Sequence, residues 1–116
     1  MAERLVRKRR IREAIGAEAT TRMPLWYWRV GDAILIGQPN EAYSYLQTAL
    51  RHRFPETPIV VMNCVNGPYC GYLPPEDLYD LDLYPVWQTP LERGCLEKTL
   101  AVCREQIEPW RIRQER

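Results

Sequence analysis

Two side chains in the middle of the chain have types and positions suited to metal or acid–base chemistry. Glu41 follows the apolar run Ala33–Ile36, and Tyr72 follows a second run, Ile59–Asn63, and a glycine-containing turn. A carboxylate binds metal ions or acts as a base, and a phenol donates to a developing oxyanion or binds a metal as phenolate. In open sheets, ligands bind beyond the carboxyl ends of the parallel strands. We therefore take Glu41 and Tyr72 as the candidate site residues.

Each of these residues also has a purely structural interpretation. Asn40 is predicted to cap a helix, and Glu41 to occupy its first position, where a carboxylate stabilises the helix by a few tenths of a kcal/mol. Tyr72, in the sequence Gly-Tyr-Leu-Pro, can pack beneath its own loop. Spacing alone does not separate these interpretations from a site.

The elements around the pair predict an α/β fold. We expect a small sheet in two or three layers, with a parallel strand–helix–strand crossover, a preceding β-hairpin strand and flanking N- and C-terminal helices. A single domain would span residues 1–116, with a basic helix at 1–16, the hairpin and crossover at 24–72 and a C-terminal helix at 89–108.

Local signals predict where these elements begin and end. Gly31-Asp32 between two strand-like runs indicates a hairpin turn. Phe54-Pro55 should end the central helix, because the residue before proline is disfavoured in helical conformation. Thr89-Pro90-Leu91-Glu92 has the form of a capping box and predicts that the last helix begins there. Pro109 should end that helix.

Composition narrows the class of protein. The chain has 116 residues and a formal net charge of +1, which argues against nucleic-acid binding driven by bulk charge. No apolar run approaches the roughly 20 residues that span a bilayer, so we expect no transmembrane segment. The basic N-terminal helix could form a nucleic-acid or membrane patch, but Glu3, Glu13 and Glu18 dilute it, and a solvated face is predicted.

The remaining ligand types give no second site. The one histidine, His52, would lie roughly 16 Å along the helix from Glu41 and cannot share a metal with it. The acids after residue 75 lack the oxygen-ligand spacing of a calcium loop and are expected on a short helix or loop. They are Glu76, Asp77, Asp80 and Asp82.

The four cysteines show no C-x-x-C pair and no zinc-ribbon spacing. Cys95 and Cys103 are expected on one helix, eight residues apart, so they should not pair with each other. Reduced, partly buried thiols are one interpretation. A Cys64–Cys70 bridge across the glycine-containing turn stays open as the other.

The order of the motifs resembles a known family. The run RVGDAILIGQPNEAY, followed by HRFPETPIVVMNCVNGPYCGYLPPEDLY, is similar to the neutral/alkaline non-lysosomal ceramidases. The similarity lies in the last part of their zinc-hydrolase domain, in the form found in uncharacterised bacterial members. It is best over about residues 25–80.

The resemblance implies a specific chemistry. Its glutamate and tyrosine positions match Glu41 and Tyr72, which would be two of the four protein ligands of a catalytic zinc. The other two ligands in the family are histidines in an upstream segment that this chain does not contain. The family hydrolyses the amide bond of ceramides with a zinc-bound water. The chain would then be the carboxyl-side part of a zinc-dependent amidohydrolase, inactive and without tightly bound zinc until that segment is supplied.

One residue departs from the family pattern beside the ligand. Asn40 stands where the family has the glycine of Pro-Gly-Glu, and asparagine is the non-glycine residue that best tolerates left-handed angles. The turn can therefore survive, with more bulk beside the metal.

A second hypothesis treats the chain as a non-catalytic α/β interaction or structural module. The aromatic strand Leu25–Val30 is expected at a sheet edge, where it could support self-association. The expected partners are an upstream segment of the same protein, another domain or a second copy. Family members are often secreted or periplasmic, but this sequence predicts no compartment.

Overall fold

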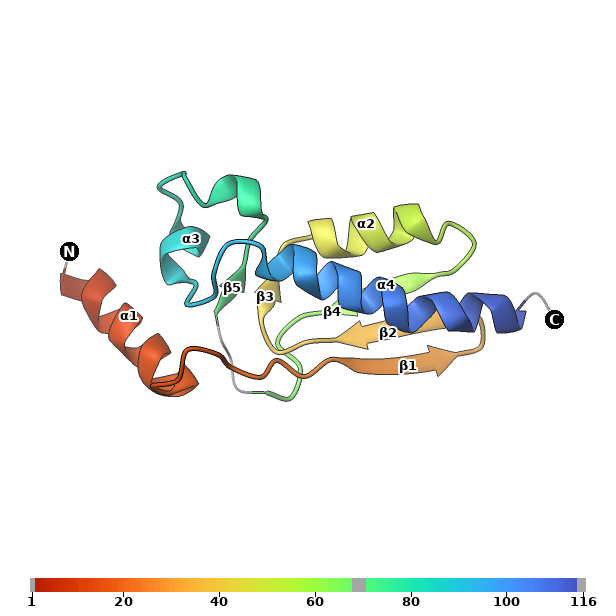
Figure 1. Cartoon of the computed structure of the whole chain (residues 1–116), viewed down its shortest axis with the longest axis horizontal. Coiled ribbons are helices and arrows are strands. Elements are labelled where there is room, and N and C mark those ends of the chain that lie inside the picture. The colour runs from red at the N-terminus through yellow and green to blue at the C-terminus, as the bar shows by residue number, and fades with distance from the viewer. Residues whose placement is uncertain (1, 68–70, 115–116) are drawn as a thin grey trace.

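The computed structural model describes residues 2–67 and 71–114 and shows a mixed helix-and-strand fold, which confirms the α/β class (Figure 1). The elements in chain order are α1 (Ala2–Ile15), β1 (Trp26–Val30), β2 (Ala33–Gly37), β3 (Glu41–Ala42), α2 (Tyr45–Arg53), β4 (Ile59–Met62), β5 (Tyr72–Leu73), the 3₁₀ helix η1 (Glu76–Leu78), α3 (Tyr84–Gln88) and α4 (Cys95–Gln114).

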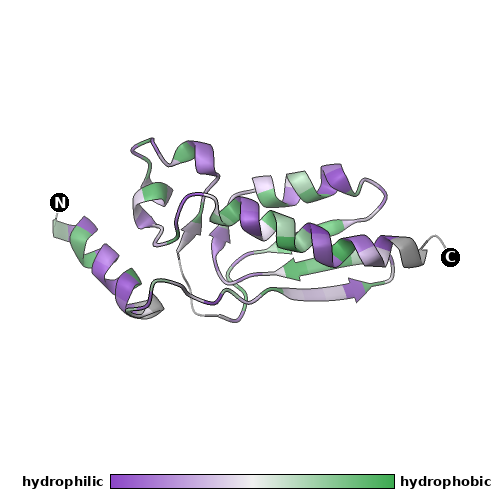
Figure 2. Ribbon diagram, in the orientation of Figure 1, coloured by the Kyte–Doolittle hydropathy of each residue, from purple (hydrophilic) through white to green (hydrophobic). Residues whose placement is uncertain are grey.

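Three strands form the main sheet, in the order β1-β2-β4. β1 and β2 pair antiparallel around the turn at Gly31, whose φ of 61° is a left-handed conformation that glycine adopts without steric cost. β2 and β4 pair in parallel, with Ile34 opposite Ile59. Figure 2 shows β2 as largely hydrophobic, as expected for a central strand.

The hydrophobic core lies between this sheet and two helices, α2 and α4, which cover the same face of the sheet (Figure 1). Side chains at alternate positions of β2 and β4 point into it, because successive residues of a strand face opposite sides. The fully or almost fully buried members include Ile34, Ile36 and Ile59 of the sheet and Leu46, Leu50, Leu96 and Leu100 of the helices.

A second, two-stranded sheet continues the chain beyond the main sheet. β3 and β5 pair in parallel, with Glu41 opposite Tyr72 and Ala42 opposite Leu73. Leu73 is fully buried in the core, so one face of this small sheet belongs to the protein interior. The other face carries both candidate site residues.

The predicted start of the central helix is wrong. Glu41 is not a first helical residue but a strand residue, and α2 begins at Tyr45 after Ser44. The Glu41 amide donates to the carbonyl oxygen of Gly71 at 3.1 Å, a tertiary bond that sequence inspection could not include. Asn40 is likewise no helix cap, since its backbone and side chain are used elsewhere.

Both predicted ends of the last helix are also wrong. The hydroxyl oxygen of Thr89 accepts from the Leu91 amide within a turn, and α4 begins only at Cys95. The helix continues through Pro109 to Gln114. Proline removes one helical hydrogen bond, but Trp110 packs edge-on against the ring of Tyr27 at 6.0 Å and holds the next turn on the sheet.

The N-terminal helix α1 is confirmed as a helix, and two of its apolar side chains face solvent. Leu5 and Val6 are exposed, and α1 lies against α3 at one end of a molecule that measures 57 × 26 × 20 Å. Among the described helices, none has both the length and the apolar character needed to cross a bilayer.

A buried thiol makes stability depend on pH. The Tyr27 hydroxyl donates to the Sγ of Cys103 at 3.5 Å, and burial raises the pKa of the Cys103 thiol. Such a thiol stabilises the fold fully below about pH 8.5, its unfolded pKa, and this contribution is lost as pH rises toward the folded value. We expect urea titrations to show a free energy of unfolding that falls between pH 8 and 9.5, with a smaller fall in Cys103→Ala. An identical fall in both proteins would contradict this assignment.

Candidate functional site

Glu41 and Tyr72 are direct neighbours across the β3–β5 pair. Paired residues of adjacent strands lie about 4.8 Å apart and project from the same face of the sheet. The opposite face holds Ala42 and the fully buried Leu73. Both candidate side chains therefore project from the non-core face, and each is partly exposed. The structure brings together the two residues that the sequence singled out, although through a strand pair that the sequence did not predict.

A buried amide network turns the chain from β2 into β3. The side-chain amide of Gln38 donates to the carbonyl oxygen of Asn40 and to the side-chain oxygen of Asn63, both at 2.6 Å. The Asn40 amide donates back to the Gln38 side chain at 2.8 Å. Gln38 and Asn40 are completely buried, so these bonds satisfy groups that water cannot reach. The network thus sets the position of Glu41, the next residue.

The same network ties β3 to the end of β4. Asn63 donates to the carbonyl oxygen of Ala42 at 3.0 Å, and the Cys64 amide donates to that of Asn40 at 3.1 Å. Cys64 has a φ of 56°, an uncommon value for a residue other than glycine. The chain after β4 is therefore bound to the residues on both sides of Glu41, Asn40 and Ala42.

Tyr72 lies against an aromatic row. Its ring meets that of Tyr84 edge-on at 5.8 Å, and Tyr84 meets Trp87 in the same manner at 4.8 Å. Arg7 of α1 donates to the Tyr84 hydroxyl at 2.7 Å. The guanidinium of Arg4 lies 4.8 Å from the centre of the Trp87 ring. Helix α1 is thus held against α3, and a single residue, Tyr84, links it to Tyr72.

The two oxygen donors fit half of a zinc site. Zinc accepts carboxylate oxygens, but protein sites supply three or four ligands. Glu41 is partly exposed, and the hydrogen bonds and ion pairs found among the described residues do not include its carboxylate. Within the same described ranges, no three His, Cys, Asp or Glu side chains gather closely enough to hold a metal. Further ligands would have to come from outside these residues.

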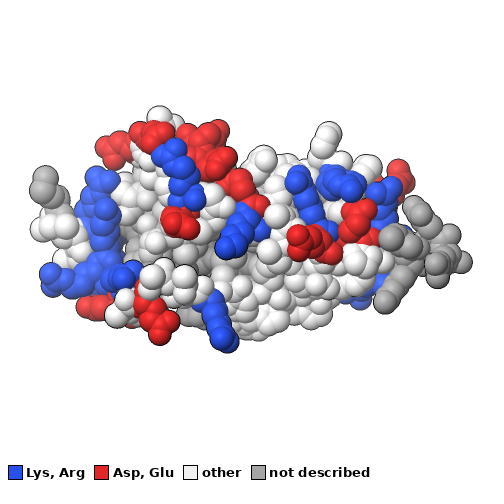
Figure 3. All heavy atoms as spheres, viewed as in Figure 1, with Lys and Arg blue, Asp and Glu red and all other residues white. Residues whose placement is uncertain are grey.

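Two carboxylates of the acidic segment, those of Asp80 and Asp82, form ion pairs with arginines. Asp80 forms an ion pair with Arg93, whose hydrogen bond and charge lower the pKa of the Asp80 carboxyl. Asp82 pairs with Arg4 at 3.5 Å. Figure 3 shows charged side chains of both signs over α1 and this segment. Exposed pairs of this kind contribute little to stability, but they leave these carboxylates engaged.

Two of the described cysteines, Cys95 and Cys103, have environments that disfavour the reactive thiolate. Cys95 and Cys103 both lie on α4, as predicted. Burial raises the pKa of both thiols, which lowers the fraction of reactive thiolate near neutral pH. Cys64 is exposed. The Cys64–Cys70 hypothesis involves Cys70, which lies outside the described residues.

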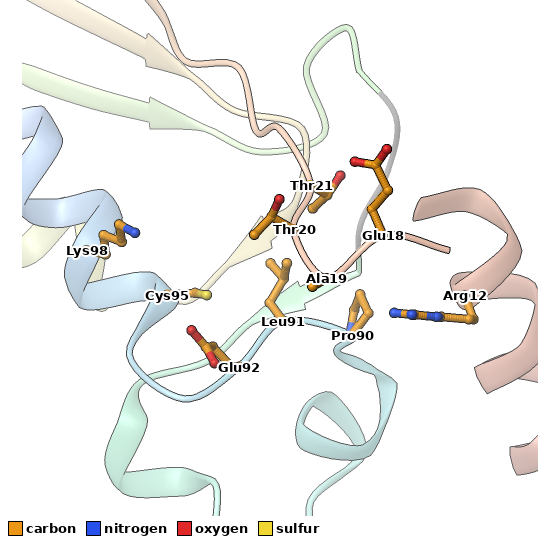
Figure 4. A pocket seen from close by; sticks show the side chains of 10 residues that line it. All are labelled: Arg12, Glu18, Ala19, Thr20, Thr21, Pro90, Leu91, Glu92, Cys95 and Lys98. Carbon is orange, nitrogen blue, oxygen red and sulfur yellow. The ribbon is translucent and has the colours of Figure 1, made fainter. Parts of the chain in front are cut away.

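A hollow of about 310 Å³ lies away from the Glu41–Tyr72 pair, between the end of α1 and the start of α4 (Figure 4). Its lining mixes both charges with small residues: Arg12, Glu18, Ala19, Thr20, Thr21, Pro90, Leu91, Glu92, Cys95 and Lys98. The Cys95 thiol has a raised pKa, and no histidine lines the hollow to activate it. We therefore do not take this hollow as the reactive site.

Three positioning residues were missed at the sequence level: Gln38, Asn63 and Gly71. The first two are amides at the ends of neighbouring parallel strands, and that equivalence was the available signal. In the sequence, Gly71 is visible only as part of the glycine-containing turn before Tyr72. Its φ of 89° and the nearness of Gln88 and Pro90 give it a specific role.

Gly71 allows a close approach beneath β5. A methyl group there would lie 2.9 Å from the backbone oxygen of Gln88, whereas a methyl at Gly31 would meet no atom within 4 Å. Both glycines have left-handed φ, so alanine costs about 1–2 kcal/mol at each. We expect Gly71→Ala to cost roughly 1–3 kcal/mol more than Gly31→Ala, because of overpacking, in urea denaturation. Equal losses would show that the contact is not restrictive.

The sequence was compared with protein-family models and curated proteins, and the fold with solved structures; none of the three comparisons gave a match. The case for a function therefore depends on the geometry of the site and on the motifs of the chain.

Proposed function

We propose that the chain is the carboxyl-side part of a ceramidase-like, zinc-dependent amidohydrolase, to which it contributes two metal ligands, Glu41 and Tyr72. The observation that carries this proposal is their register, because the two residues are direct partners in a parallel strand pair and share its non-core face. A random pair of residues 31 positions apart has no reason to meet in this way, and the motifs around both residues follow the order described for the family.

The finer architecture belongs to the same proposal. β2, α2 and β4 would form the strand–helix–strand crossover, with β3 and β5 as extensions of its two parallel strands. Ligand sites of open sheets lie beyond the carboxyl ends of such strands. Glu41 and Tyr72 follow those ends in the chain, which is consistent with a site there.

Each residue of the pair would have a distinct task. The Glu41 carboxylate would bind the ion directly. Tyr72 would bind through its phenol oxygen after losing its proton, and the edge contact with Tyr84 limits the directions in which its ring can point. Asn40, fully buried in the amide network, would keep Glu41 in place rather than contact substrate. Bound zinc would supply an activated water for attack on an amide carbonyl.

The two zinc ligands that this chain would lack indicate what its partner would supply. Two histidines would be supplied by an upstream segment of the same protein or by another domain, as the resemblance implies. The substrate class, a lipid amide, also comes from the resemblance alone. Without that segment the chain would bind zinc weakly and would not hydrolyse amides.

The module hypothesis is favoured by a different observation. β1 is an edge strand of the main sheet, and its residues Trp28 and Val30 are exposed. Self-association through this edge would make the chain an interaction module without any metal. A dimer in sedimentation that persists in a zinc chelator and is lost in Trp28→Lys would favour this second candidate.

Zinc titration of the chain, followed by ¹H–¹⁵N NMR, tests the two ligands. We expect weak binding, without stoichiometric saturation at micromolar zinc, because a zinc site normally needs three or four protein ligands. The largest shifts should lie at β3 and β5, and Glu41→Gln and Tyr72→Phe should each remove them.

The matched control is Glu56→Gln, which alters an exposed carboxylate in the turn before β4 and should leave the zinc shifts unchanged. Tight stoichiometric zinc would show that the account of missing ligands is wrong. Shifts that survive in both Glu41→Gln and Tyr72→Phe would place the ion elsewhere.

A further inference from the structure

Helix α1 is attached to the rest of the chain differently from α2 and α4. Those two helices bury leucines in the core, whereas every residue of α1 from Ala2 to Glu13 except Ile11 is exposed. Figure 1 shows α1 beyond the end of the main sheet, beside α3. Burial of apolar side chains, which gives most helices their stability in proteins, therefore contributes little to the position of α1.

Two arginines connect α1 to the segment around α3. The guanidinium of Arg4 lies 4.8 Å from the centre of the Trp87 ring and forms an ion pair with Asp82 at 3.5 Å. Arg7 donates to the Tyr84 hydroxyl at 2.7 Å, and its guanidinium lies 6.0 Å from the centre of the same ring. We call these contacts of Arg4 and Arg7 the arginine latch.

Beyond the latch, hollows separate α1 from its surroundings. One hollow of about 240 Å³ has Lys8, Ile11 and Arg12 on one side and residues 87–90 on the other. The hollow of Figure 4 adjoins it and shares Arg12 with it. The second half of α1 is therefore not closely packed against α3.

The connection from α1 to the main sheet is irregular. Gly16 follows the helix with a φ of 86°, and no atom lies within 4 Å of where a Cβ would stand on it. Residues 16–25 form neither helix nor strand. This segment thus leaves α1 free to move away from α3 without disturbing the strands.

Dissolved salt weakens every contact of the latch. The side-chain exposures are 43% for Arg4, 43% for Arg7 and 86% for Asp82. Exposed ion pairs and cation–π contacts are weak, and ions screen them, since the Debye length falls from about 30 Å at 0.01 M salt to about 3 Å at 1 M. A helix of 14 residues is only marginally stable by itself in water, so α1 would lose helical order once released.

Tyr84 couples the latch to the candidate site. Its hydroxyl accepts the Arg7 hydrogen bond, and its ring meets that of Tyr72 edge-on at 5.8 Å. Loss of the Arg7 bond would remove a contact that holds the Tyr84 ring. The Tyr72 ring would then gain freedom to rotate, because Tyr84 limits the directions in which it can point.

We propose that α1 is an electrostatic latch that controls the orientation of Tyr72. In the closed state, Arg4 and Arg7 hold α1 on α3 and keep the Tyr84 ring against Tyr72. In the open state, α1 is released into solvent and the Tyr72 ring takes up more orientations. Ionic strength determines which state is populated.

The latch does not depend on zinc. It concerns the mobility of α1 and of the Tyr72 ring, whether or not that ring binds a metal. All measurements below are made on the full chain without zinc, so this inference and the proposed function fail separately.

The first test measures ¹⁵N relaxation of the backbone amides by NMR at about 20 mM and about 500 mM NaCl, since screening is much stronger at the higher concentration. We expect the order parameters of α1 to fall from about 0.85, a rigid backbone, to below about 0.6, a flexible one. Those of α4 should not change.

The second test removes the latch at low salt. In the double variant Arg4→Gln/Arg7→Gln, we expect α1 to be flexible already at the lower salt concentration and the aromatic NMR signals of Tyr72 to shift. The matched control is Arg9→Gln/Arg10→Gln, which makes the same change of charge on the same helix outside the latch and should keep α1 rigid. Unchanged amide signals in β2 and β4 establish that each variant is folded.

Four results would overturn the proposal. They are an α1 already flexible in the unaltered chain at low salt, an α1 equally rigid at both salt concentrations, equal release of α1 in the two double variants, and Tyr72 signals that stay the same when α1 is released. The salt titration uses the unaltered chain and therefore decides the first two even if a variant does not fold.

Discussion

The amide network of Gln38, Asn40 and Asn63, in which Gln38 and Asn40 are fully buried, sets the turn that leads from β2 into β3. Without this turn, the parallel pair β2–β4 would continue straight. The side chains of its next residues would go on alternating between the two faces of the main sheet. Instead, Gln38 bonds to the Asn40 backbone in both directions and to Asn63 on the neighbouring strand. A buried amide left without partners costs about 1–3 kcal/mol, so the turn is strongly specified. Everything that β3 and β5 present to the outside follows from it.

Sequence reasoning succeeded where a single local signal was sufficient. The hairpin turn at Gly31, the N-terminal helix and the mixed α/β class all have such signals and were predicted. It failed where tertiary contacts decided the outcome. Glu41 looked like a helix start because Asn40 is a good cap, yet its amide bonds to Gly71, 30 residues later. Pro109 looked like a helix end, yet Trp110 packs on Tyr27 and the helix continues.

The candidate site was predicted at the level of its two residues but not of its supports. Both chemical types and both positions after apolar strands were visible in the sequence, and the register of β3 and β5 joins them. The network residues were not recognised, because the sequence of an amide residue that follows a strand is the same whether the folded protein exposes or buries its side chain. The role of Gly71 depends on Gln88, a partner 17 positions away whose nearness no local pattern encodes.

A common theme joins the two candidate functions, which is that the chain offers incomplete surfaces. The Glu41–Tyr72 pair supplies two of the three or four ligands that zinc needs. The main sheet has helices on one face and seven uncharged side chains on the other. The distance between the Glu41 carboxylate and the Tyr72 phenol oxygen, in a crystal structure determined with zinc, tests the central claim most directly. The account predicts a separation of about 4 Å or less, the reach of two bonds of about 2 Å to one ion. A separation of more than roughly 6 Å, beyond what one zinc can bridge, would contradict it.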